Sequence, residues 1–336
     1  MLLSLSSGRF RATIMQTRRL GYTDLKLTTV GLGTWAIGGG GWRFGWGPQD
    51  DDEAIGAILT ALDKGINWID TAAVYGFGHS EELIGKALKQ TSEKPFIATK
   101  CSRIWDNEGQ IIPCLKAESI REECHASLKR LGIDIIDLYQ MHWAEPEQDI
   151  EQGWEEMARL IDEGKVRFIG VSNANNEHIE RMQKIHPVAS LQPQYNMLHR
   201  EVEERVLAYC ARKNIGVVAY SPMERGLLTG KFSQERLAAM PLEDHRRRSP
   251  DFHDPQFTAT LLLVDQLRPI AERNGFSLAQ LAISWVLRRS EVTAAIVGAR
   301  RSDQIAETAA TADRTLAQED IEEIEKLLAK RQEKLK

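Results

Sequence analysis

The chain has 336 residues, of which 42% are hydrophobic, so it is long enough to bury a large core in one barrel or two medium-sized domains. Its formal net charge of -5 gives no electrostatic basis for binding nucleic acid or an acidic membrane surface, which leaves small molecules as the expected partners. No apolar run approaches the roughly 20 residues of a membrane-spanning helix.

The four cysteines are scattered along the chain without the spacing of a metal or redox motif: Cys101, Cys114, Cys124 and Cys210. A chain of this size does not need disulfides for stability, so we expect a reduced, cytoplasmic protein.

Residues 1–18 are predicted to form a flexible N-terminal extension. They contain arginines and serines but no acidic residue, a composition shared with some organelle transit peptides. The apolar run from Leu2 to Leu5 is shorter than that of a secretory signal, and Met15 is an alternative start. We therefore favour a tail or an over-long start over a targeting segment.

The first expected strand, residues 28–33, ends in Gly31-x-Gly33-x-x-Ala36, which formally matches a dinucleotide-binding fingerprint. That motif requires a helix to follow, but residues 38–41 are all glycine, and each costs about 1 kcal/mol in a helix interior. The segment is therefore predicted to be a loop after the first strand. The aromatic residues that follow, Trp42, Phe44 and Trp46, are expected either to line a pocket or to cover the barrel mouth.

A unit of helix, glycine, apolar strand and polar loop recurs along the rest of the chain. Further strands are expected at residues 66–69, 96–99, 135–141, 166–171, 217–220 and 294–297. Helices are expected at 50–62, 81–88, 119–131, 154–161, 201–212, 257–273, 278–288, 302–311 and 318–330.

This alternation predicts an α/β protein with a closed (β/α)8 TIM barrel as a single domain over residues 19–330, and the final helix docked on it. An open doubly wound sheet is the alternative, weakened by the missing strand–glycine turn–helix motif. The irregular segment 229–256 is expected to be a loop over the site.

Ionisable side chains stand at the ends of three successive strands. Asp70 and Tyr75 follow the second strand, Lys100 ends the third and His142 ends the fourth. In a barrel these groups converge at the mouth, where they would form a proton-transfer site. A phenol needs a nearby cation to release its proton readily, which is the role expected for Lys100, and a buried lysine needs a carboxylate partner such as Asp70. His142 would donate a hydrogen bond to a substrate carbonyl.

The motifs around these residues resemble those of the aldo-keto reductase superfamily. They are Asp70-Thr71-Ala72-x-x-Tyr75-Gly76, Lys100, and Leu138-Tyr139-Gln140-Met141-His142-Trp143. Three further segments are similar to bacterial members grouped with general stress proteins: Trp42-x-x-Gly45-Trp46-Gly47, Tyr75-Gly76-Phe77-Gly78 and Gly298-Ala299-Arg300. The resemblance implies an NADPH-dependent reductase of aldehydes and ketones that uses no metal, with Tyr75 as the general acid.

The resemblance also implies a cofactor site for NADP(H). Ser172, Asn173 and Gln192 would hold the nicotinamide amide, and Tyr220 would stack on its ring. The other implied contacts are Gly33, Thr34, Trp35, Asp70, Ser221, Pro222, Met223, Arg225, Gly226, Lys231, Arg246, Gly298, Ala299, Arg300, Gln304, Glu307 and Thr308. The chain departs from many members at Gly298-Ala299 and Thr308, where they carry Lys-Ser and Asn, so the preference for NADP(H) is implied less firmly than cofactor binding.

The substrate pocket is expected to favour apolar or aromatic aldehydes because of its tryptophans: Trp35, Trp42, Trp46, Trp105 and Trp143. Two other functions remain open, an NAD-dependent sugar or alcohol dehydrogenase and a cofactor-binding redox sensor that serves as an accessory subunit of a potassium channel. We expect a monomer by default, since the sequence shows no feature that indicates an oligomer.

Overall fold

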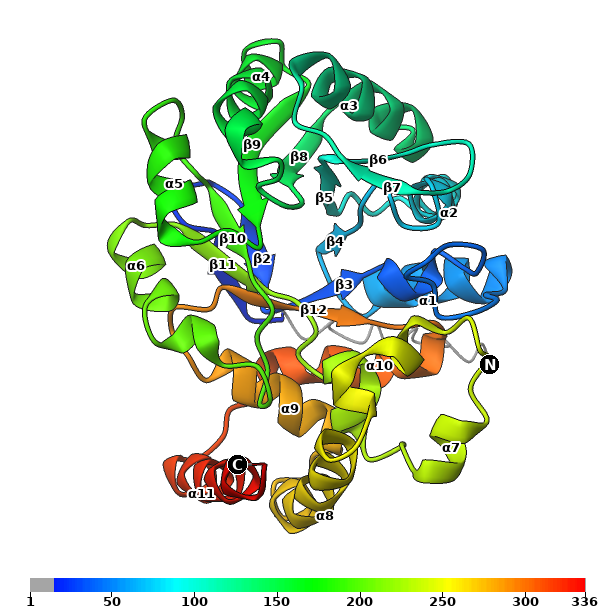
Figure 1. Ribbon diagram of the computed structural model, residues 1–336, viewed down its shortest axis with the longest axis vertical. Coiled ribbons are helices and arrows are strands. Elements are labelled where there is room, and N and C mark those ends of the chain that lie inside the picture. The colour runs from blue at the N-terminus through cyan, green and yellow to red at the C-terminus, as the bar shows by residue number, and fades with distance from the viewer. Residues whose placement is uncertain (1–14, 336) are drawn as a thin grey trace, which may run out of the picture.

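Eight parallel strands close into a barrel in the computed structural model, which describes residues 15–335 (Figure 1). The order around the barrel is β10-β11-β12-β3-β4-β5-β8-β9. The strands are β3 (Val30–Gly33), β4 (Trp68–Asp70), β5 (Phe96–Cys101), β8 (Ile136–Met141), β9 (Val166–Ser172), β10 (Ser190–Gln192), β11 (Gly216–Ala219) and β12 (Ala294–Gly298). The predicted (β/α)8 barrel is confirmed, and the open sheet is excluded because β12 pairs with β3.

Eight helices alternate with these strands and surround the barrel (Figure 1). They are α1 (Asp51–Asp63), α2 (His79–Leu88), α3 (Ala117–Leu131), α4 (Ile150–Asp162), α5 (Asn176–Gln183), α6 (Val206–Arg212), α9 (Leu278–Leu287) and α10 (Ser302–Ala309). The predicted helix at 201–212 is divided into a 3-10 turn, η3 (Glu201–Glu203), and α6. Neither α5 nor β10 was predicted. For β10 the reason is that the strand has only three residues, two of them polar.

The two ends of α1 follow local sequence rules. The Asp50 side chain accepts a hydrogen bond from the Glu53 backbone N–H of α1, and three acidic residues stand in the first turn. Gly65 then adopts φ +91°, which lets the chain turn from α1 into β4. This loop places Asp70 at the carboxyl end of β4.

Two long helices lie outside the ring. The helices α8 (Gln256–Arg273) and α11 (Gln318–Lys334) pack against each other (Figure 1). Ile324 and Leu328 of α11 are buried, so the predicted docking face exists. Within residues 15–335, no helix is both long and apolar enough to cross a membrane.

A hairpin that was not predicted precedes the barrel. Its strands β1 (Thr17–Arg19) and β2 (Lys26–Thr28) are antiparallel, and the neighbouring Leu20 and Leu25 belong to the same buried cluster as Trp68. Residues 1–14 of the predicted 1–18 extension lie outside the described residues, whereas Thr17 and Arg18 belong to β1. Three-residue strands give too little periodicity to be predicted.

A second hairpin, β6 (Arg103–Trp105) and β7 (Ile111–Pro113), follows β5 and stands over the carboxyl ends of the strands. The predicted loop at 229–256 is less irregular than expected. It contains α7 (Gln234–Ala238), η5 (His245–Arg248) and η6 (Pro250–Phe252), and it follows the 3-10 segment η4 (Glu224–Thr229).

Candidate active site at the carboxyl ends of the strands

A cavity of about 1240 Å³ opens at the carboxyl ends of the barrel strands. Its walls include the strand-end residues Gly33, Asp70, Ser172, Gln192 and Gly298. A volume of this size exceeds the roughly 300–1,000 Å³ of typical small-molecule sites, so the cavity has room for a cofactor together with a substrate.

A buried ion pair forms the floor of the site. Lys100 Nζ donates to Asp70 Oδ1 at 2.6 Å and to the Thr71 carbonyl oxygen at 2.7 Å, and it lies 3.4 Å from Tyr75 Oη. The Lys100 side chain has no exposed surface and that of Asp70 has 4%. All three ammonium hydrogens therefore have acceptors, as a buried charge requires.

The other oxygen of the Asp70 carboxylate is held by two amides. Gln192 Nε2 donates to Asp70 Oδ2 at 2.8 Å, and Gln140 Nε2 donates to it at 3.2 Å. Gln192 was predicted as a cofactor residue only, and Gln140 was missed. The sequence offered one signal for Gln140: it is an amide near the end of a mostly buried strand, Ile136–Met141, two residues before His142.

Tyr75 and His142 face the cavity side by side, with ring centroids 5.8 Å apart. Burial and the Asp70 charge raise the pKa of Tyr75 well above its ordinary value. Burial, together with the charges of Lys100 and Arg103, lowers the pKa of His142 well below its ordinary value. At neutral pH the site therefore presents a protonated phenol beside a neutral imidazole.

These pKa directions describe the resting protein. Burial and the Asp70 charge raise the pKa of Tyr75, and the help that Lys100 was expected to give in releasing the proton stays a prediction. Burial also lowers the pKa of Lys100, and Asp70 acts in the opposite direction. Tyr75 therefore keeps its proton in the resting protein.

Every residue predicted to hold the cofactor lines the cavity. Near the strand ends, Tyr220 Oη donates to Asn173 Oδ1 at 2.9 Å, and Asn173 Nδ2 donates to Ser172 Oγ at 3.0 Å. Ser172 Oγ in turn donates to the Gln192 carbonyl oxygen at 2.8 Å. This chain fixes the side chains that were predicted to meet a nicotinamide amide and ring; their contact with the cofactor stays a prediction.

The other end of the cavity is rich in cations although the whole chain carries a net charge of -5, and four of these cations pair with carboxylates. The cations there are Arg225, Lys231, Arg236, Arg246, Arg300 and Arg301. Arg300 donates to the carbonyl oxygens of Trp46 at 3.3 Å and of Pro48, and Arg246 pairs with Asp244 at 2.7 Å. Because α10 also begins here, its N-terminus adds to the positive potential, and these donors fit a group that carries phosphates.

Two loops meet above the cavity. His245 N donates to the Gly45 carbonyl oxygen at 2.9 Å, and the guanidinium of Arg246 lies 4.3 Å from the ring centroid of Trp46. Trp42 and Phe44 line the cavity as well. The glycine-rich loop 38–49 is thus both pocket wall and cover, which answers the question that the sequence left open.

One predicted pocket residue is wrong. Trp105 does not line the cavity, whereas Trp35, Trp42, Trp46 and Trp143 do. Trp105 instead packs on Phe77 with ring centroids 5.4 Å apart. Its pairing partner Ile111 on β7 does line the cavity, so the hairpin reaches the pocket at this point and it is the indole, packed on Phe77, that is absent from the wall.

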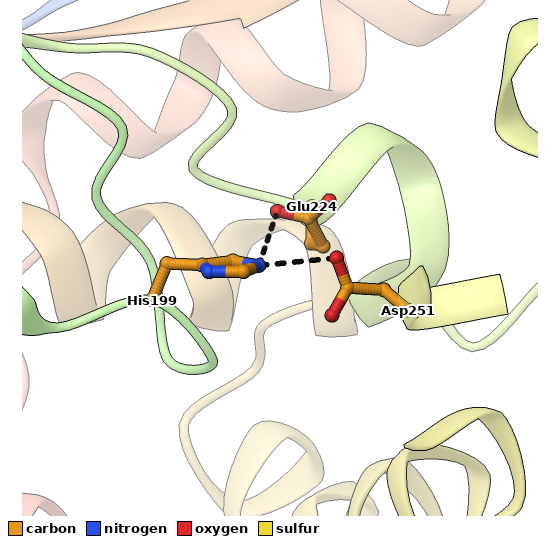
Figure 2. Close-up of side chains that lie close together, drawn as sticks. All are labelled: His199, Glu224 and Asp251. Atoms are coloured by element: carbon orange, nitrogen blue, oxygen red, sulfur yellow. Dashed lines mark hydrogen bonds and ion pairs between the residues drawn. The ribbon is translucent and has the colours of Figure 1, made fainter. Parts of the chain in front are cut away.

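An ion-pair cluster holds the loop after β11. Figure 2 shows His199, Glu224 and Asp251 directed toward one another, with His199 Nε2 3.1 Å from Asp251 Oδ2 and 3.6 Å from Glu224 Oε2. The hydrogen bond to Asp251 raises the pKa of His199. These residue types also bind metals, but Arg225 pairs with both carboxylates and supplies the opposing charge. We interpret the cluster as structural, since it fixes Arg225 at the cavity; no local pattern in the sequence predicts it.

A buried acid behind the site yields a testable pH dependence. Glu123 of α3 accepts from Ser102 N at 3.3 Å and from Ser119 Oγ at 3.2 Å, and burial raises its pKa to about 7. The native carboxyl thus keeps a proton that the unfolded one releases near 4.5, so stability falls as pH rises through this window, by about 3 kcal/mol. Glu123→Gln is expected to abolish that fall.

Urea unfolding at about pH 5 and about pH 8 measures this difference. The exposed Glu82→Gln, which removes an acid on α2 without a buried partner, serves as the matched control and should keep the wild-type slope. An equal slope in Glu123→Gln and the wild type would contradict the assignment.

The fold and the cavity define a barrel enzyme with a phenol, an imidazole and a buried ammonium–carboxylate pair at its mouth. The family model described as "Aldo/keto reductase family" matches residues 29–329 of the chain. The chain belongs to the aldo-keto reductase family, whose members are oxidoreductases that use nicotinamide cofactors.

Individual relatives cover nearly the whole chain. Aldo-keto reductase YhdN of Bacillus subtilis is 39% identical over 94% of this chain and 94% of its own length. The NADH-specific methylglyoxal reductase of Escherichia coli is 36% identical over 91% and 98%. The solved glycerol dehydrogenase AKR11B4 from Gluconobacter oxydans superposes with a TM-score of 0.85 at 37% identity, over 94% of this chain and 96% of its own.

Proposed function

We propose that this protein is an NADPH-dependent reductase of aldehydes and ketones with Tyr75 as its general acid. The observation that carries the proposal is the protonated phenol, placed beside His142 in the cavity and 3.4 Å from the buried Lys100 ammonium. The basic end of the same cavity suits a dinucleotide, and its aromatic walls suit an apolar carbonyl compound.

The residues of the chain account for the proton side of the reaction. NADPH, when bound, would supply a hydride to the carbonyl carbon and would be oxidised to NADP⁺. As the carbonyl π bond breaks, its oxygen takes the proton from Tyr75 Oη, which yields an alcohol. The Lys100 ammonium stabilises the phenolate that remains, and Asp70 keeps that ammonium charged. A neutral His142 donates a hydrogen bond to the oxygen as negative charge develops on it.

The preference for NADPH over NADH rests on the arginines at the start of α10. Arg300 and Arg301 line the cavity where an adenosine 2′-phosphate would lie. A guanidinium pairs well with phosphate, whereas the 2′-hydroxyl of NADH carries no charge for it to recognise. A relative of similar identity is NADH-specific, so this part of the proposal needs its own test.

Titration of the protein with NADPH and with NADH, followed by tryptophan fluorescence, provides that test. We expect tighter binding of NADPH and, in Arg300→Met, a loss of about tenfold or more in NADPH affinity with little change for NADH. Methionine keeps the length of the side chain without its charge. Arg121→Met, which removes a half-exposed arginine on the outer surface of α3, is the control. Equal loss of affinity for both cofactors in Arg300→Met would contradict a role in recognising the 2′-phosphate.

The titrated samples then receive a panel of aldehydes and of polyols. Turnover of aldehydes with NADPH supports the reductase. Oxidation of polyols with NAD⁺ would favour the second candidate, an NAD-dependent alcohol dehydrogenase, which the solved glycerol dehydrogenase relative suggests. Binding without any turnover would favour a redox sensor. We further propose that the enzyme acts in the cytoplasm as a monomer.

A further inference from the structure

A cation stands at the substrate end of the cavity, apart from those expected to meet the cofactor. Arg103 begins β6, three residues after Lys100, and its side chain lines the cavity with 14% of its surface exposed. Its charge contributes to the lowered pKa of His142, which indicates that it lies near the imidazole. Arg103 takes no part in the proton transfer described above.

The position of Arg103 in the barrel separates it from the cofactor cations. Those follow β11 and β12, whereas Arg103 follows β5, three strands from β12 and four strands from β11 in the barrel order. Four strands is the largest separation in a ring of eight. A dinucleotide whose phosphates bind to the segments that follow β11 and β12 would leave Arg103 available to bind the substrate.

The guanidinium is only partly neutralised. Arg103 Nη2 donates to Glu145 Oε2 at 2.7 Å, and this is its one side-chain hydrogen bond among the described residues, although a guanidinium offers five N–H donors. Glu145 is 55% exposed, so its carboxylate can turn into solvent at little cost. A second anion could therefore bind beside Glu145 or replace it.

The backbone around Arg103 is held firmly. The preceding Ser102 has φ +76°, and its Oγ donates to the Trp143 carbonyl oxygen at 3.1 Å and accepts from Trp143 N at 3.3 Å. The indole of Trp143 lies 5.7 Å from the guanidinium. These contacts join the loops after β5 and β8, so Arg103 is preorganised rather than free to leave the cavity.

We propose that the preferred substrates are aldehydes that carry an anionic group, a carboxylate or a phosphate, which Arg103 binds while the aromatic walls hold the spacer between that anion and the carbonyl. Glu145 competes for the same guanidinium and weakens this preference. The inference rests on the proposed reductase function and names its substrate class. A partly buried arginine favours such an anion because charge-assisted hydrogen bonds strengthen where water is excluded.

Rigid substrate pairs that differ only in charge test this proposal. The 3- and 4-carboxybenzaldehydes are compared with the corresponding methyl formylbenzoates, which are neutral and similar in shape. We expect Arg103→Met to lower the acid-to-ester ratio of kcat/KM by about tenfold or more, while Glu145→Gln raises it severalfold. Arg103→Lys, which keeps the charge but not the planar fork, should give an intermediate ratio.

Binding of the product acid provides a readout that does not depend on turnover. The affinity of 4-(hydroxymethyl)benzoate for the protein with NADP⁺ bound should fall in Arg103→Met and rise in Glu145→Gln. Arg121→Met is the matched control and should change neither measurement, since this arginine pairs with Glu156 and Glu163 outside the cavity.

Unchanged ratios and unchanged binding of the acid in both Arg103→Met and Glu145→Gln would overturn the proposal. If the esters are reduced and the ratios do not move, the reductase function stands without this substrate class. If no aldehyde is reduced but the acid still binds through Arg103, the anion site stands and the reductase function fails.

Discussion

Replacing Tyr75 with phenylalanine is expected to lower kcat for aldehyde reduction by a factor of about 10²–10⁴ while the Kd for NADPH stays within about twofold. The phenol is the group with a transferable proton that faces the cavity beside His142. Without it, negative charge on the carbonyl oxygen must be met by the His142 hydrogen bond alone. Because phenylalanine fills the same space between Trp35 and Trp42, the pocket should keep its shape.

The separation of the two readouts decides the outcome. Cofactor binding, followed by tryptophan fluorescence, reports whether the cavity is intact, and single-turnover kinetics report the chemical step. Tyr22→Phe is the control. It removes a hydroxyl that donates to the Pro187 carbonyl oxygen at 3.3 Å and does not line the cavity, so both readouts should stay unchanged. A Tyr75→Phe variant with more than about one-tenth of wild-type kcat would remove Tyr75 from the role of general acid.

The barrel and its mouth could be predicted because their signals are local. Each apolar strand ends in a polar loop, and parallel strands place their carboxyl ends together, so Asp70, Lys100 and His142 converge without any knowledge of side-chain packing. The cofactor residues were predicted from the resemblance to the aldo-keto reductases, and the segments that carry them follow strands or the helices next to them. Their common location in one cavity is what the closed barrel adds.

The contacts that tune the site could not be predicted, because they join residues distant in sequence. Gln140 and Gln192 meet on one oxygen of Asp70 from two other strands. Arg103 lines the cavity from a hairpin that is too short to show a periodic sequence pattern, whereas Trp105 on the same strand does not line the cavity. The direction of the Tyr75 pKa likewise depends on burial, which the sequence does not measure.

The Asp70–Lys100 pair should also matter for stability. Replacing Lys100 with methionine leaves the buried Asp70 carboxylate without its cation, and only the two glutamine amides still donate to it. We expect the free energy of unfolding to fall by about 3–5 kcal/mol and turnover to fall with it, because the phenolate of Tyr75 loses its stabilising charge. Urea unfolding and steady-state kinetics measure the two losses.

The double variant Asp70→Asn/Lys100→Met separates charge from packing. It removes both members of the ion pair, so no buried charge remains unpaired, and most of the lost stability should return while activity does not. The asparagine introduced by Asp70→Asn still offers an oxygen to the amides of Gln140 and Gln192, which limits the disturbance to the carboxylate itself. If the double variant were as unstable as Lys100→Met, the loss would stem from altered packing rather than from the unpaired charge. If Lys100→Met alone kept wild-type stability, the prediction that the buried Asp70 carboxylate depends on Lys100 would be contradicted.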